Sequence, residues 1–351
     1  MSLATQRKLT SQAIADLWQN TFFGRYWRAI GTFLGRGKTV SIWVSAAVVM
    51  LLNLFLGASI SELLGETRFT SIQMILTNLM WIAYTYFATI LFLGVHSRFL
   101  GFLRLRLIES IESPQHIQGL QAWAEQWLGR RFQQFLFNFV FALIVAPLSF
   151  YAIYPATDFS IGTVLIYSIN FFHLGVLVYG LISLIAFLLR LRNWNLRLYP
   201  DDPASTPILL QLSEQLRDYI LIYSFATALF MLLMSFVGAL NMITTVEFLI
   251  FNWIPILTIF ILGHYAFSSL ITNVKHERMG IIQSKIMNIS KLGQIDTKTT
   301  AQIMSLMDYH DRVKTAKNSL INSQAIVNLI ASLALPLLTT FIQNLLKGLL
   351  F

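Results

Sequence analysis

Seven long windows of this sequence contain no Asp, Glu, Lys or Arg. Each window holds 23 to 31 residues, and about 20 residues are enough for a helix to cross the hydrocarbon core of a bilayer. The pattern predicts an all-α, polytopic integral membrane helix bundle with six spans, a seventh C-terminal span and cytoplasmic helical extensions. The windows are Thr39–Ser61, Phe69–Ser97, Phe132–Thr157, Phe159–Leu189, Tyr219–Val246, Phe248–Val274 and Asn318–Leu346.

The composition favours the same class of protein. Apolar residues make up 56% of the chain and charged residues 12%, whereas an ordinary soluble domain has about 25% charged residues. We expect no cleaved signal peptide, because residues 1–38 carry six Lys and Arg and no long apolar run. The absence of cysteine excludes disulfides, thiolate metal sites and a cysteine nucleophile.

The basic residues predict how the chain is oriented in the membrane. Of the 25 Lys and Arg, 23 lie in residues 1–38, in the connections 98–131 and 190–218, and in the segment 275–317. Basic residues accumulate on the cytoplasmic side of membrane proteins. We therefore expect the N-terminus and these segments to lie in the cytoplasm, on the inner side of a cell (inner or plasma) membrane. This topology accounts for the formal charge of +9 without a nucleic-acid partner.

The N-terminal segment 1–38 is predicted to contain an amphipathic helix at the membrane surface. Between Thr21 and Lys38 the aromatic residues share one side of a helical wheel, and basic residues lie on the other. Trp27, Arg25 and Arg28 are the expected anchor residues. The alternative functional interpretation is a lipid sensor, whereas the simpler one is an anchor that packs beside the bundle.

The segment 275–317 is predicted to form a cytoplasmic helical hairpin. Its second helix is expected to begin at Asp296 or Thr297 and to continue without a breaker to Pro336, as a stalk entering the membrane. The DYHDR sequence around His310 does not predict a catalytic or metal site, because its acidic residues and His310 diverge on a helical wheel. Surface pairs are expected instead, and these are Asp308 with Arg312 and Asp311 with Lys314.

Residues 318–351 are predicted to form a C-terminal membrane helix with an uncharged polar stripe. Lipid cannot satisfy amide and hydroxyl groups, so the stripe must face protein or water. One interpretation is hydrogen bonding to the other helices. The other is a pore lined by copies of this helix, with Asp311 and Lys314 at its mouth and Pro336 as a hinge. The predicted pore-lining residues are Asn318, Asn322, Asn328, Ser332, Thr339 and Gln343.

The first six windows give little support to other activities. Their lack of carboxylates disfavours ion-coupled carriers, and no phosphate-binding glycine loop, HExxH motif or nucleophile elbow is present. His173 and His264 lie at similar predicted depths and are a conceivable haem or metal pair. The expectation, however, is no cofactor, no metal and no catalytic residue, with His173 and His264 in ordinary hydrogen bonds.

The leading hypothesis is a homo-oligomeric membrane ion channel or pore, lined by the C-terminal helix and gated by the cytoplasmic helical layer. The alternative is a non-conducting membrane sensor or scaffold that docks a cytoplasmic protein partner. A facilitator for a small solute and a membrane enzyme rank below these two. The expected partners are the lipid bilayer and further copies of the chain. The layout resembles that of insect chemoreceptor channels, in arrangement and without a shared motif.

Overall fold

The computed structural model describes residues 2–34, 42–65, 72–153, 161–236, 242–290, 297–320 and 326–335, together with residue 338. Within these residues the chain is all-helical, as predicted, and has no strand. A last helical stretch, Ile326–Leu335, is called the C-terminal segment below. The elements are α1 (Leu3–Gln19), α2 (Phe22–Leu34), α3 (Ile42–Leu63), α4 (Ile72–Phe102), η2 (Leu103–Leu107), α5 (Ile108–Ser110), α6 (Pro114–Ala124), η3 (Glu125–Gly129), α7 (Arg131–Ile153), α8 (Ile161–Leu191), η5 (Pro203–Ser205), α9 (Pro207–Phe236), α10 (Met242–Ser290) and α11 (Thr297–Thr315).

Four stretches of the described chain are long and apolar enough to cross a membrane. They are Asn78–Ser110, Arg131–Leu148, Ile161–Leu191 and Trp253–Ser290. Two further stretches, Ala47–Leu63 and the C-terminal segment, are apolar but shorter. Large apolar side chains stay exposed along these helices, as at Phe139 and Leu143 of α7. An uncovered apolar belt of this kind is what a lipid-facing surface requires, and these helices indicate a membrane protein.

Helix α8 lies at the centre of the bundle and contacts α3, α4, α7 and α10. Small residues allow the closest of these approaches. A Cβ atom added to Gly162 would collide with the backbone of Gly57 in α3, and one added to Gly180 would collide with the Phe92 ring in α4. Small residues at helix crossings let backbones approach closely where lipid provides no hydrophobic driving force.

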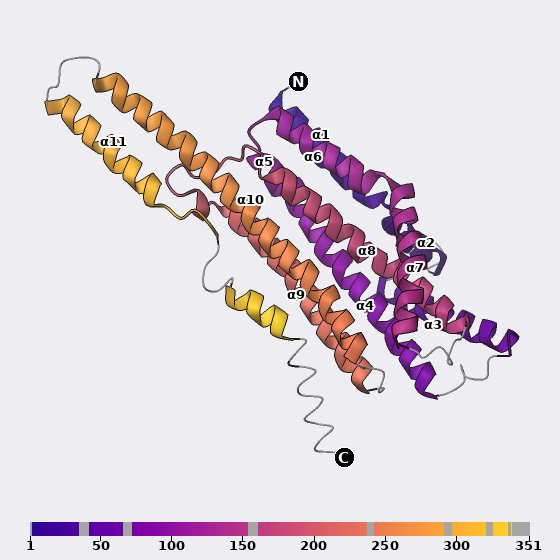
Figure 1. The fold of residues 1–351 in the computed structure, drawn as a ribbon. Coiled ribbons are helices and arrows are strands. Elements are labelled where there is room, and N and C mark those ends of the chain that lie inside the picture. The colour runs from indigo at the N-terminus through magenta and orange to yellow at the C-terminus, as the bar shows by residue number, and fades with distance from the viewer. Residues whose placement is uncertain are drawn as a thin grey trace.

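One end of the bundle carries the basic residues near the ends of α4 and α8. We call it the charged end. A layer formed by α1, α6, η3 and the chain between α8 and α9 covers it (Figure 1). Backbone bonds between Glu112 and Asn195 and between Arg197 and Ser110 join two connections that are far apart in sequence. Trp123 in α6 donates its indole N–H to the carbonyl of Ser183 in α8 at 3.0 Å, which fixes the layer to the bundle.

Helices α10 and α11 form a hairpin that projects beyond the charged end (Figure 1). Helix α10 has 49 residues and is about 73 Å long at 1.5 Å per residue, more than twice the thickness of a hydrocarbon core. Its first part therefore lies in the bundle and its last part in the hairpin. The hairpin predicted between residues 275 and 317 is present, with a second helix that begins at Thr297.

The predicted continuous helix from Thr297 to Pro336 is wrong. Helix α11 ends at Thr315, and residues 316–320 are not helical before the chain reaches the C-terminal segment. The cause is a contact that sequence spacing does not reveal. Lys275 of α10 donates to the carbonyl oxygens of Lys314 and Ala316, at 3.0 and 2.6 Å. These carbonyls are therefore satisfied from outside the helix, and the chain turns toward α10.

Candidate functional site

Three of the six predicted pore-lining residues lie in the described chain, and they are Asn318, Asn328 and Ser332. Asn318 is in the non-helical stretch that follows α11, and the other two are in the C-terminal segment. Because the helix is interrupted before Asn318, a single helical wheel no longer relates Asp311 and Lys314 to Asn328 and Ser332. The remaining predicted residues, Asn322, Thr339, Gln343 and the hinge Pro336, lie outside the described residues.

The C-terminal segment runs antiparallel to α10. Ser268 of α10 donates its hydroxyl to the carbonyl of Asn318 at 3.0 Å. Trp253 of α10 donates its indole N–H to the carbonyl of Leu333 at 3.1 Å. Along α10 the two bonds are 15 residues apart, which corresponds to about 22 Å of helix. This part of the chain therefore enters the apolar zone beside α10.

The C-terminal segment, α9 and α10 enclose a cavity of about 340 Å³. Asn328 and Ser332 both line it, so the described part of the polar stripe faces other helices of the same chain. Ser332 is only 3% exposed. The complete lining consists of Leu210, Ser213, Glu214, Leu216, Arg217, Ile220, Leu221, Ile259, Phe260, Gly263, His264, Phe267, Leu320, Asn328, Leu329 and Ser332.

Two buried polar atoms of this lining, Oγ of Ser332 and Nδ1 of His264, have no hydrogen-bond partner in the described part of the chain. Leaving a buried polar atom unsatisfied costs about 1–3 kcal/mol. A polar cavity of this size has room for water or for polar groups of a ligand. The cavity can therefore hold water or a ligand, whereas the two atoms themselves have almost no accessible surface and lie just behind its wall. We call this region the His264–Ser332 cavity.

The charge at the mouth of the His264–Ser332 cavity comes from α9. Glu214 and Arg217 are both exposed, both line the cavity, and lie three residues apart on one helix face. Among the described residues they form no ion pair with each other or with another side chain. In contrast, the next acidic residue, Asp218, pairs with Arg98 of α4 at 3.7 Å. The mouth therefore offers one negative and one positive group.

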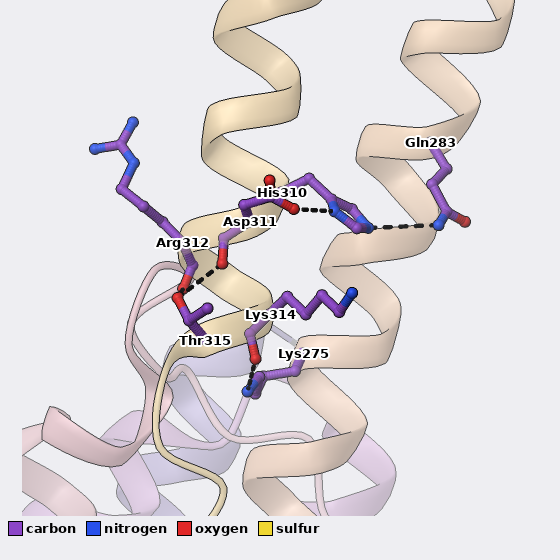
Figure 2. A network of polar contacts seen from close by, with 7 residues as sticks. All are labelled: Lys275, Gln283, His310, Asp311, Arg312, Lys314 and Thr315. Atoms are coloured by element: carbon purple, nitrogen blue, oxygen red, sulfur yellow. Dashed lines mark hydrogen bonds and ion pairs between the residues drawn. The ribbon is translucent and has the colours of Figure 1, made fainter.

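Lys275 holds the chain that leads into the C-terminal segment. Its side chain is 3% exposed, and besides the two backbone carbonyls it donates to Oδ1 of Asn318 at 2.6 Å. Figure 2 shows Lys275 directly beneath Lys314, whose own side chain points away from it. The predicted mouth residues Asp311 and Lys314 are exposed on α11, in the hairpin beyond the bundle.

The DYHDR sequence lies on the hairpin, and the predicted surface pairs are replaced by other contacts. Nδ1 of His310 lies 3.4 Å from Oδ1 of Asp311, while the Gln283 amide approaches the other ring nitrogen (Figure 2). Arg312 lies over the Tyr309 ring instead of pairing with Asp308. No group of three or more His, Asp or Glu residues with metal-site geometry occurs among the described residues.

Tyr309 connects the hairpin to the connection between α8 and α9. A hydrogen bond to the Asp201 carboxylate is the main reason why the pKa of Tyr309 lies above its usual value, and partial burial adds to it. The carboxylate accepts a hydrogen bond from the phenol O–H, which stabilises the neutral phenol over the phenolate. The Lys275 contacts hold the end of α11 against α10, whereas the Tyr309 contact connects the hairpin to the chain between α8 and α9.

His173 and His264 have different environments. Both ring nitrogens of His173 have partners, namely the carbonyl of Ile169 at 2.8 Å and the hydroxyl of Tyr26 at 3.2 Å. His173 therefore has no free nitrogen for a haem iron or another metal. His264 lines the cavity, and its Nδ1 is buried without a hydrogen-bond partner among the described residues.

The predicted anchor residues are on α2, which forms a separate helix after α1. Thr21 begins it by accepting the N–H of Gly24 with its hydroxyl, at 3.1 Å. Arg25 and Arg28 are exposed, as a surface anchor requires, and bond to Asn20 and to the carbonyl of Gly24. The side chain of Trp27 lies outside the described part of the structure.

Sequence reasoning missed Glu214, Arg217 and Lys275 as site residues. Glu214 and Arg217 precede a charge-free window, so they read as ordinary interfacial charges. Only the packing of the C-terminal segment against α9 and α10 brings them together with His264 and Ser332. Comparisons of the chain with protein-family models, curated proteins and solved structures find no match.

Proposed function

We propose that the protein is a membrane channel or pore, assembled from several copies of the chain, whose pathway is lined in part by the C-terminal helix. In this proposal the chain crosses a cell membrane six or seven times, with its N-terminus and the charged end on the cytoplasmic side. The excess of Lys and Arg at that end supports the orientation.

The observation that carries the proposal is the His264–Ser332 cavity. It runs from the exposed charges of Glu214 and Arg217 to the polar residues Asn328 and Ser332, which lie between apolar helices. A pathway for a hydrated solute requires such groups, because an apolar wall alone dewets and closes. The opposite side of the C-terminal segment exposes Ile326, Val327 and Ile330. That side suits lipid or a neighbouring copy.

The test is conductance in planar bilayers made from phosphatidylcholine. Ser332→Leu removes the hydroxyl and narrows the cavity, so we expect a clear fall in single-channel conductance. Ile330→Leu is the matched control, because Ile330 is 60% exposed on the other side of the same helix and should conduct like the unmodified chain. Unchanged conductance of Ser332→Leu, or no conductance of any variant, would refute this pathway.

The second candidate is a non-conducting sensor or scaffold that docks a cytoplasmic protein. The projecting hairpin favours it, because Met287, Met304 and Met307 are more than half exposed there. Flexible, polarisable methionines are common at surfaces that accept varied partners. A monomer that never conducts but retains a soluble protein through this hairpin would support the second candidate. Met304→Glu combined with Met307→Glu should then abolish retention.

A further inference from the structure

The His264–Ser332 cavity has a polar and an apolar end. Ser213, Glu214 and Arg217 lie at the end nearest the start of α9, and Leu221 lies further along the same helix. On α10, Ile259 and Phe260 line the deeper part. Most of the lining is apolar, with a few polar groups in fixed places, which is the usual constitution of a small-molecule site. The charged groups lie at the mouth, and the deeper lining is apolar apart from the uncharged Asn328 and Ser332. This matches a molecule with a charged head and a largely apolar body.

The side of the cavity is continuous with the apolar surface of the bundle. Leu221 lines the cavity and is 47% exposed. Leu257 and Ile261, which flank the lining residues Ile259 and Phe260 on α10, are exposed as well. A lipid can therefore enter sideways from the bilayer, with its headgroup remaining at the charged end. A soluble, polar metabolite would leave most of the apolar lining of the cavity without a contact.

The two charges at the mouth specify the headgroup further. Glu214 and Arg217 have opposite charge, lie on one face of α9 and are not paired with each other. Arg presents several N–H donors to a phosphate, and a carboxylate accepts hydrogen bonds from a primary ammonium group. A phosphate and a primary ammonium occur together in an ethanolamine headgroup. A choline headgroup has no N–H to donate, and a glycerol headgroup has no cation.

We propose that this cavity binds a phospholipid with an ethanolamine headgroup. Arg217 binds the phosphate, and Glu214 accepts hydrogen bonds from the ammonium. His264 and Ser332 line the cavity and pack beside the glycerol part of the lipid. The acyl chains lie against Leu221 and Phe260. The binding is non-covalent throughout.

This site rests on the part of the proposed function that puts the chain in a bilayer, and it does not require conduction. If the chain also conducts, a bound lipid lies in the pathway and lowers the current. Conductance should then be smaller in bilayers that contain phosphatidylethanolamine than in phosphatidylcholine alone.

The experiment is native mass spectrometry of the full chain in detergent, titrated with phosphatidylethanolamine, phosphatidylcholine and phosphatidylglycerol that carry identical acyl chains. We expect phosphatidylethanolamine to be retained about fivefold better than phosphatidylcholine, as for one additional exposed ionic contact. Glu214→Gln should remove this preference. Arg217→Gln should weaken retention of all three lipids. Glu277→Gln, an exposed carboxylate in the hairpin outside the cavity, is the control and should bind like the unmodified chain.

A second variant separates lipid binding from misfolding. Ser332→Phe fills the cavity and should reduce retention of every lipid, while the melting temperature in detergent stays close to that of the unmodified chain. Equal retention of phosphatidylethanolamine and phosphatidylcholine, or a preference that survives Glu214→Gln, would overturn the lipid site alone. A chain that stays monodisperse without detergent would overturn the membrane placement as well. Absence of conductance would overturn the channel and leave the lipid site intact.

Discussion

Two regions at the same end of the bundle differ in how they are filled. Where α4, α6 and α8 meet, the rings of Phe99, Trp123, Trp194 and Phe187 pack edge to face, with Phe187 at 5.3 to 5.6 Å from the other three. The opening beside His96 in this region is only about 30 Å³. Where α9, α10 and the C-terminal segment meet, the cavity is about 340 Å³. We call these the packed region and the open region.

The histidines of the two regions show the same difference. Nδ1 of His96 lies 2.7 Å from the hydroxyl of Tyr219, and the ring is covered by Phe92. Nδ1 of His264 is buried without a partner among the described residues. A buried polar group that is satisfied by the protein adds to stability, and one that is left without a partner lowers it. The packed region therefore supports the fold, and the open region is the part that can bind something.

The largest effect is expected in the packed region. Trp123→Ala removes a fully buried ring and the bond to Ser183, so the free energy of unfolding should fall by about 3–5 kcal/mol. Leu329→Ala in the lining of the open region should lower it by about 1 kcal/mol. Denaturant unfolding in detergent measures both. Equal losses would remove the energetic distinction between the regions.

Lys275→Met should weaken one wall of the open region and leave the packed region intact. Lys314, Ala316 and Asn318 lose their common donor, and we expect a loss of about 2–3 kcal/mol. Limited proteolysis should then cut within residues 316–320. Lys285→Met, an exposed lysine on the same helix, should change stability by no more than about 0.5 kcal/mol. Protection of residues 316–320 in Lys275→Met would contradict the proposed role of this lysine.

A smaller effect is expected at Tyr309, whose bond to Asp201 ties the hairpin to the bundle. Its pKa is raised in the folded chain, so the contact stabilises the fold below the ordinary pKa of about 10 and is lost as the pH rises through the folded value. Tyr309→Phe should lower the free energy of unfolding by about 0.5–1.5 kcal/mol at neutral pH. The difference between ultraviolet titrations of the unmodified chain and of Tyr309→Phe isolates the Tyr309 phenolate. Its titration midpoint should lie above 10. Asp201→Asn should lower that midpoint, and an unchanged midpoint would exclude the bond.

The sequence predicts the helical class and the location of most helices, because charge-free windows and prolines are local signals. Helices begin at Pro114 and Pro207, and α11 begins at Thr297 as expected. The end of α11 was not predictable in this way. It depends on Lys275, which lies about 40 residues away in sequence and meets Lys314 only after the hairpin closes.

The candidate site was predictable in part. The polar stripe identified Asn328 and Ser332, and His264 stood out as an imidazole in an apolar window. Their convergence could not be read from the sequence, because a helical wheel gives the direction of a side chain and not the neighbour it meets. Whether Asn322, Thr339 and Gln343 continue the pathway remains a prediction.

The central claim is that the open region is reached by water or by a polar ligand group from the charged end. The chain has no cysteine, so Ser332→Cys and Ile330→Cys each carry a single thiol. In phosphatidylcholine liposomes, a charged, membrane-impermeant thiol reagent should modify Ser332→Cys, although Ser332 is buried. It should spare Ile330→Cys, although Ile330 is 60% exposed on the apolar surface. Modification of Ile330→Cys with protection of Ser332→Cys would contradict the account.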